Sequence, residues 1–280
     1  MLTAMPFGTK GVSIAVLAAI VLSAAACGGG GSGKAAKPSA STRTSTRTSA
    51  SAAASATASA PTAQAAQAAS SSGAAGSPLT TDEISNQILL TGNDEAGYTF
   101  DPTQDSKATT NTQDVVATGG SACQTFVDAQ EALSPKYGTT AEVDRELTKA
   151  GDGHSIEDSV MTFPSAAEAS ALITDLAAGL KGCQSLSVPQ QGGGSVTMSP
   201  SAIPELAKAG QAGYIDYLTA DGKAELMAAE LVAVGTAVSV VAIIGPVSTD
   251  PTVLKQMGGT LLSHLSDVQA GRLKSAQGVS

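Results

Sequence analysis

A short apolar run over residues 12–21, followed by Cys27 and a long tract of small residues, restricts folding to the later part of this chain. The run is about half the roughly 20 residues that a membrane-spanning helix requires, and Lys10 precedes it. A basic residue, a short apolar segment and small residues before a cleavage site are typical of a secretory signal peptide. Residues 1–26 are therefore predicted to be removed on export.

Cys27 carries a second signal. A cysteine directly after the cleavage site resembles the bacterial lipoprotein signal, in which that cysteine is lipidated. One acyl chain gives marginal membrane binding, whereas two or more give a stable anchor. The resemblance implies several chains on Cys27, contact with the membrane through this anchor, and a location at the outer face of the cytoplasmic membrane.

The segment that follows, 27–78, is predicted to be the lipidated cysteine and a disordered linker. It is rich in Gly, Ser, Thr, Ala and Pro and contains no acidic residue. Such a composition cannot bury enough apolar area to offset the entropy of ordering. As a flexible coil of 51 residues, 28–78 would span on the order of 40 Å. A plain spacer and an O-glycosylated stalk are both compatible with this composition.

The charge of the chain excludes some functions. All 24 acidic residues lie in 79–280, with ten of the 15 basic residues, so this region has a net charge of −14. Nucleic acids and anionic lipid surfaces attract Lys and Arg, so no nucleic-acid partner is expected. Trp is absent and Phe and Tyr number four each, which argues against stacking platforms for sugars or bases.

Residues 79–280 are predicted to form a single α+β domain. Its length suits one core, and hydrophobic periodicity alternates between helical and strand spacing. The predicted class is an antiparallel (mixed) sheet with helices packed on one face, and 102–120 is predicted to be irregular. Helices are expected near 81–90, 121–133, 165–181 and 252–272, and strands near 98–100, 143–147, 154–163, 184–188, 195–199, 213–219, 226–234 and 237–244.

Two cysteines remain once Cys27 is assigned to lipid. Cys123 and Cys183 are separated by 60 residues, and in an exported protein such a pair most often forms a disulfide. The alternative is a reactive thiol on Cys123, with His154 as its base. No metal site is predicted, because two cysteines and two histidines this far apart lack ligand spacing.

Three segments are similar to a known family. Leu79–Ile84, leading to Leu89-Leu90 and Gly97-Tyr98, resembles the start of many actinobacterial cell-surface lipoproteins. Cys123 in a helix, and Val160–Ala169 followed by Cys183, complete a resemblance to the PknH-like extracellular sensor domain over about 79–270. The resemblance implies a mixed sheet with helices, a cleft, a ligand-sensing role and the Cys123–Cys183 disulfide.

The chain shows no sequence motif of a hydrolase, a zinc protease or a phosphate-binding loop, and no cofactor is predicted. Adjacent carboxylates such as Glu157-Asp158 point to opposite faces of a strand, so they do not form an acid–base pair. Arg145 is a candidate for receiving an anionic ligand. The alternative is a salt bridge from Arg145 to a carboxylate on a neighbouring strand.

These observations predict a non-enzymatic, lipid-anchored protein that binds or senses a ligand at the cell envelope, with a small ligand or a cell-wall component as its partner. A large apolar cleft would favour this hypothesis. A flat exposed apolar patch would favour a module that docks on another envelope protein. A hydrolase without a recognisable motif is the third hypothesis.

Overall fold

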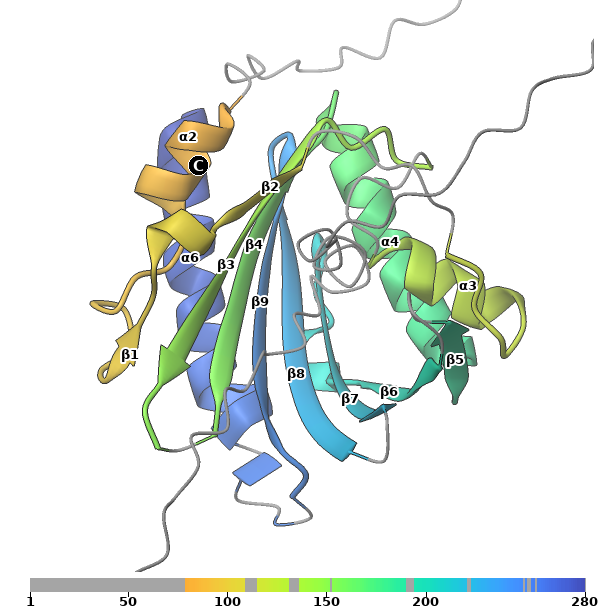
Figure 1. Ribbon diagram of the computed structural model, residues 1–280. Coiled ribbons are helices and arrows are strands. Elements are labelled where there is room, and N and C mark those ends of the chain that lie inside the picture. The colour runs from red at the N-terminus through yellow and green to blue at the C-terminus, as the bar shows by residue number, and fades with distance from the viewer. Residues whose placement is uncertain are drawn as a thin grey trace, which may run out of the picture. The chain divides into compact units, whose positions relative to one another are not determined.

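The computed structural model describes residues 79–108, 115–130, 136–151, 153–189, 194–220, 223–248, 250, 253–254 and 256–279. The predicted signal peptide and linker, 1–78, lie outside the described residues, and so does Cys27. The described chain forms one antiparallel sheet with helices on both sides (Figure 1).

The helical elements begin with a capped turn. They are α2 (Thr81–Glu83), the π-helix η1 (Ile84–Ile88), the 3-10 helix η2 (Pro102–Gln104), α3 (Ser121–Asp128), α4 (Ala166–Gly182), the 3-10 helix η3 (Pro204–Leu206), the π-helix η4 (Gln256–Leu261) and α6 (Leu262–Gln277). At the start of α2, Thr80 and Glu83 form a reciprocal capping box, which satisfies backbone donors that the first helical turn leaves open.

The strands are β1 (Tyr98–Thr99), β2 (Ser106–Ala108), β3 (Ala141–Lys149), β4 (Ser155–Thr162), β5 (Leu186–Pro189), β6 (Ser195–Ala202), β7 (Gln211–Ala220), β8 (Lys223–Val234) and β9 (Ala237–Pro246). Their order is β1-β3-β4-β9-β8-β7-β6-β5, and β2 pairs with the same edge of β3 as β1 does. Strands β3 and β4 form one hairpin and β5 to β9 a meander. The last strand, β9, joins the two by pairing with β4.

One face of the sheet packs against α3 and α4, and we name it the α4 face. Along β8 it carries Met227, Ala229 and Leu231, which share a core cluster with Leu172 and Leu176 of α4. Helix α4 forms here because Ser165 caps it by accepting a hydrogen bond from the Ala167 N–H (3.2 Å), and because its Ala and Leu residues favour helix.

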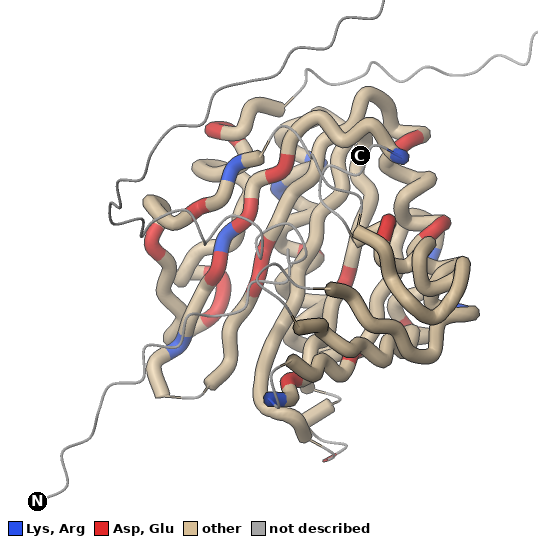
Figure 2. The backbone as a smooth tube through the Cα atoms, turned by 45° about the vertical axis from the view of Figure 1, so that its right-hand side comes forward, with Lys and Arg blue, Asp and Glu red and all other residues tan. Residues whose placement is uncertain are grey.

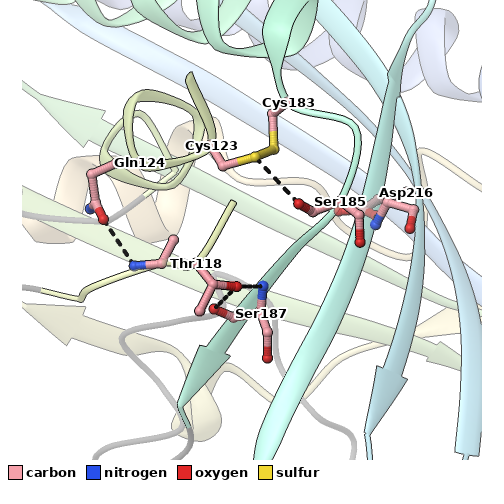
Figure 3. Close-up of a disulfide and its surroundings, with 9 residues drawn as sticks. Thr118, Cys123, Gln124, Cys183, Ser185, Ser187 and Asp216 are labelled. Carbon is pink, nitrogen blue, oxygen red and sulfur yellow. Dashed lines mark hydrogen bonds between the residues drawn. A yellow bond between two sulfur atoms is a disulfide. The ribbon is translucent and has the colours of Figure 1, made fainter. Parts of the chain in front are cut away.

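The disulfide Cys123–Cys183 ties the start of α3 to the end of α4 (Figure 3). The two helices approach closely at Gly179, where an added Cβ would lie 2.7 Å from the backbone nitrogen of Phe126. The segment before α3 is held on the sheet edge, since the Ser187 N–H of β5 donates to the Thr118 hydroxyl at 2.9 Å (Figure 3). The predicted disulfide is thus present, and a free thiol on Cys123 is not.

The opposite face packs against α6, and we name it the α6 face. Leu226, Ala228 and Val241 lie there with Leu262 and Leu265, because alternate residues of a strand point to opposite sides. Helix α6 ends beneath the β8–β9 hairpin, where the Thr236 N–H donates to the Gln277 side chain at 3.0 Å. The N-terminal segment lies on the same face, with Ile84 and Ile88 in a cluster that includes Leu273.

The predicted α+β class and antiparallel sheet are confirmed. The helices, however, cover both faces and not one, because β8 and β9 are apolar on both sides and must bury both. The segment predicted to be irregular contains the short strand β2. The final helix has a π-helical first part, η4, before α6, and α6 extends to Gln277.

Candidate functional site

Five carboxyl groups follow one another on the α4 face, beside the part of the sheet that α4 covers. They come from alternate residues of β3, from β4 and from the start of β8, and we name them the acidic strip: Glu142, Asp144, Glu146, Glu157 and Glu225. Figure 2 shows acidic residues gathered along neighbouring strands of the sheet. Strand pairing places Glu146 directly opposite Glu157, so like charges meet across the hairpin.

A small pocket lies where the acidic strip meets the apolar part of the sheet. Its cavity volume is about 40 Å³, which exceeds what a single water molecule requires. Most of its wall area is apolar, although six of the twelve lining residues have polar side chains. The lining residues are Gln130, Glu142, Glu157, Asp158, Ser159, Met161, Tyr214, Met227, Ala229, Leu231, Val240 and Ala242.

Glu142 is the distinctive polar group of this pocket. Its residue is 3 % exposed, and its Oε2 atom has no hydrogen-bond partner. On the opposite wall, the Tyr214 hydroxyl donates to Gln130 Oε1 at 2.8 Å, and Gln130 Nε2 is without a partner. A buried polar atom without a partner is destabilising, so the pocket holds hydrogen-bonding capacity that the fold itself does not use.

The carboxyl groups of the strip resist ionisation. Burial, together with the charge of Asp144 and a hydrogen bond to it, raises the pKa of Glu142 well above its usual range. Burial also raises the pKa of Asp144. For Glu157, burial and the charges of Glu146, Asp144 and Glu225 act in the same direction and raise its pKa. Glu142 and Asp144 therefore hold their protons more tightly than exposed carboxyl groups do.

A second, larger cavity of about 600 Å³ lies at the end of the sheet, where the strip reaches Glu146 and Glu225. Its wall also contains Lys149, Lys223 and His154. The mixture of signs gives this cavity no clear charge preference. His154 lines this second cavity, whereas the Cys123 sulfur is bonded to Cys183, so the two residues do not form a thiol–base pair.

Arg145 lies on the α6 face, opposite the pocket. Its guanidinium contacts the Asp105 carboxylate at 2.6 Å, and both side chains are almost fully buried. It also donates to the backbone carbonyls of Ser85 (2.8 Å) and Leu90 (3.0 Å) and stacks over Phe100. The structure therefore places Arg145 in a network that fastens the N-terminal segment to the sheet, with its donors used by the protein.

Asp158 belongs to the same face as Arg145, while its neighbour Glu157 points to the α4 face. The Asp158 carboxyl accepts hydrogen bonds from the Leu90 N–H and from the Gln269 side chain. Burial raises the pKa of Asp158 to about 8, against the opposing effects of the Leu90 hydrogen bond and of the charges of Arg145 and Arg272. As the sequence predicted, Glu157 and Asp158 do not form an acid–base pair.

The pocket residues were not identified from the sequence. One sequence pattern pointed to part of the site. Acidic residues recur along β3, where Glu142, Asp144 and Glu146 occur at every second position. This pattern predicted a strand with one solvent-facing side. It did not show that Glu142 is buried, or that Glu142 shares a pocket with Gln130 and Tyr214 from distant parts of the chain.

Chemically, the site combines an apolar wall with carboxyl groups whose pKa values are raised by burial. This combination suits reversible binding of a small group with hydrogen-bond donors. Among the described residues, no group of three or more His, Cys, Asp or Glu side chains has an arrangement that would hold a metal ion.

The fold and pocket define an α+β module in which a twisted antiparallel sheet carries a small acidic pocket beside a disulfide-linked helix pair. Residues 71–272 match the family model of the PknH-like extracellular domain, and the chain belongs to that family. The resemblance seen in the sequence is thereby confirmed, and the matched region is a module of the extracellular type.

A solved structure has a similar fold. The crystal structure of the extracellular domain of PknH from Mycobacterium tuberculosis is similar to this chain with a TM-score of 0.51 and 14 % identity, over 71 % of this chain and 98 % of that one. At this identity the likeness shows a shared fold. A protein of unknown function from Mycobacterium smegmatis matches with a TM-score of 0.32 and 11 % identity, over 63 % of this chain and 90 % of that one. No curated protein sequence matches the chain.

In the part of the chain that the structure describes, none of the helices has the length and apolarity needed to cross a membrane.

Proposed function

We propose that this chain is a lipid-anchored envelope protein whose extracellular domain binds a small ligand without transforming it. The observation that carries the proposal is the pocket between the acidic strip and α3, whose apolar wall and unpartnered Glu142 and Gln130 atoms are features of ligand sites. Membership in a family of extracellular domains supports a location outside the cytoplasm.

The alternative of a protein-docking module receives less support. Among the described residues, the exposed large hydrophobic side chains are Val116, Tyr217 and Val247. They belong to three separate segments, the loop before α3, strand β7 and the segment after β9. Docking surfaces usually present a contiguous apolar patch, which three scattered side chains do not supply.

A pocket-filling variant tests the binding function. Ala229→Val adds two methyl groups to the pocket wall at a strand position where a β-branched residue fits the backbone. We expect fragments that bind the native chain, detected by ligand-observed NMR, to lose binding to this variant. The matched control is Ala202→Val on an exposed position of β6. Equal binding to all three chains would contradict a role for this pocket.

The anchor is tested separately by mass spectrometry of the protein from its own cells. We expect an N-terminus at Cys27 that carries several acyl chains. A Cys27→Ala variant should be released from the membrane fraction, because the acidic domain is repelled by anionic lipid. An unmodified Cys27, or cleavage at another position, would disprove the anchor and leave the binding function of the domain untouched.

A further inference from the structure

The pocket and its surroundings also indicate which chemical class of ligand the site accepts, and this step rests on the proposed binding function. We propose that the pocket binds a primary alkylammonium group. The positive charge would lie at Glu142, and the alkyl part would contact the methionine side chains of the pocket wall. Four features of the described residues support this assignment.

The first feature is the unused oxygen. Glu142 lines the cavity and is almost fully buried, and its Oε2 atom has no hydrogen-bond partner. Asp144 Oδ1, two residues along the same face of β3, also lacks one. Oxygen acceptors that lack a donor favour a ligand that donates hydrogen bonds. An ammonium group supplies three N–H donors and no acceptor.

The second feature is the sign of the charge around Glu142. Directly opposite Glu142 lie Ala108 on β2 and Met161 on β4, and the charged residues farther along the same face are Asp144 and Glu146 on β3 and Glu157 on β4. Among the described cations, Arg145 points to the other face, and Lys136 contacts Asp175 at 2.9 Å. Lys223 lies at the far end of the strip, in the wall of the second cavity. The strip thus attracts a cation and repels an anion.

The third feature is size. A cavity of about 40 Å³ accommodates a group of a few heavy atoms and not a whole drug-sized molecule. The fourth is the chemistry of the remaining wall. Met161, Met227 and Ala229 offer apolar contacts next to the carboxyl groups, and thioether side chains adapt their shape to an aliphatic stem.

Binding has a defined proton balance. In the empty pocket Glu142 holds a proton, because its carboxyl group is buried next to the carboxyl group of Asp144. When the ammonium enters, it keeps its own protons and forms hydrogen bonds with the ionised Glu142. The carboxyl proton leaves to solvent, so one proton is released for each cation bound. Affinity must then rise with pH, by up to about tenfold per pH unit while one proton is released.

The test uses the full chain with its methionine methyl groups labelled with ¹³C. Met161 and Met227 line the pocket, whereas Met257 lies in the core of the α6 face and serves as an internal control. The probes are n-butylammonium, 1-butanol and butyrate, which have the same carbon chain and differ in charge. An Nα-acetyl-lysine amide then distinguishes an amine carried on a peptide from a free amine.

We expect n-butylammonium to shift the Met161 and Met227 signals saturably while Met257 stays in place, with an affinity that increases from pH 5 to pH 8. Calorimetry in buffers of different ionisation enthalpy should show proton release. Glu142→Gln keeps the shape of the side chain but not its charge, and it should lower the affinity at least tenfold. Asp144→Asn provides a second variant, and Glu205→Gln, on the exposed η3 turn, should bind like the native chain.

The outcomes separate this proposal from the one on which it rests. If 1-butanol binds as tightly as n-butylammonium, or if butyrate binds more tightly, the cation preference is wrong while the pocket remains a binding site. If n-butylammonium binds but with no dependence on pH or on Glu142, the assigned contact is wrong. If none of the probes shifts Met161 or Met227, both the ligand class and the pocket's proposed binding role fail.

Discussion

The α6 face and the α4 face of the sheet both contain buried carboxyl groups, but their surroundings differ. On the α6 face, Asp105 contacts Arg145 at 2.6 Å and Asp94 contacts Arg272 at 2.6 Å. On the α4 face, Glu142 and Asp144 each retain an oxygen without a partner. The same sheet thus supports ion pairs between carboxylates and arginines on one side, and on the other an acidic strip in which Glu142 and Asp144 each keep one oxygen without a hydrogen-bond partner.

Of these carboxyl groups, the two on the α6 face have cationic partners, whereas the two on the α4 face lack them among the described residues. A buried charge is tolerated when it has a partner of opposite sign and further hydrogen bonds, which describes Arg145 and Asp105. A buried carboxyl without a cation stays protonated instead, which describes Glu142. The first arrangement fastens the N-terminal segment to the sheet. The second leaves a site that can change its protonation when a ligand arrives.

The largest effect is expected when the paired network loses its cation. Arg145→Met would leave Asp105 buried without a counter-charge and remove hydrogen bonds to two backbone carbonyls. We expect the free energy of unfolding to fall by about 5 kcal/mol, the upper end of the range for a broken buried pair. Urea unfolding followed by circular dichroism measures this loss.

The matched control for this variant is Lys107→Met. Lys107 and Asp82 form an ion pair at 2.8 Å whose side chains are exposed, and such pairs contribute little. We expect no resolvable change for Lys107→Met. Similar losses for the two variants would mean that burial does not distinguish the two ion pairs.

The next largest effect concerns the helices of the α4 face. Replacing Cys123 and Cys183 by Ala removes a cross-link that closes 60 residues. The chain-entropy account gives a loss of roughly 4 kcal/mol. Since α3 ends near Gln130 in the pocket wall, the variant should also weaken ligand binding. Thermal unfolding with and without a reductant should reproduce the loss in the native chain. A change below about 1 kcal/mol would show that helix packing alone holds α3.

A smaller effect should appear with pH alone. Burial raises the pKa of Asp216, on the α4 face, to about 7. A raised pKa means that the folded state binds more protons than the unfolded chain, so this stabilisation is complete at low pH and is lost as the pH rises. Between pH 5 and pH 8 we expect the free energy of unfolding to fall by roughly 3 kcal/mol on account of Asp216.

On the α6 face, Asp158, whose pKa burial raises to about 8, should add to the loss in that window, whereas Asp94 should not. Burial alone would raise the pKa of Asp94, but hydrogen bonds from Arg272 and Thr91 and the charge of Arg272 lower it. The stability from such a group is lost only as the pH falls below about 4. Chemical unfolding at several pH values, repeated with Asp216→Asn, tests the assignment. Stability that rises from pH 5 to pH 8, or an unchanged slope in Asp216→Asn, would contradict it.

Much of the fold was predictable because local signals agreed with each other. The predicted helix at 165–181 has a Ser cap and an apolar stripe, and it corresponds to α4. The predicted strands at 226–234 and 237–244 correspond to β8 and β9. The disulfide followed from the cysteine count and the resemblance to the family. Each of these predictions depends on neighbours in the sequence or on a covalent constraint.

The parts that were not predictable depend on distant contacts. Strand β2 has only three residues and exists because it pairs with the edge of β3, which no local pattern reveals. The presence of helices on both faces depends on where β9 inserts, next to β4. The pocket needs Glu142, Gln130 and Tyr214 from three separate elements. Periodicity along β3 indicated a polar side, but not its burial.

The smallest effect gives the most direct contrast between the faces. Glu142→Gln removes an ionisable group from a buried position that lacks a cation. At pH 8 we expect this variant to be more stable than the native chain, by about 1 to 2 kcal/mol, because ionising a buried carboxyl is unfavourable. At pH 5, where Glu142 is protonated in the folded chain, the two should unfold alike. On the α6 face, by contrast, removing the charge of Arg145 destabilises the folded chain.

The control for this prediction is Glu205→Gln, exposed on η3, which should change the free energy of unfolding at neither pH. A Glu142→Gln variant that is less stable at pH 8 would show that Glu142 is paired in the fold, and that the two faces do not differ.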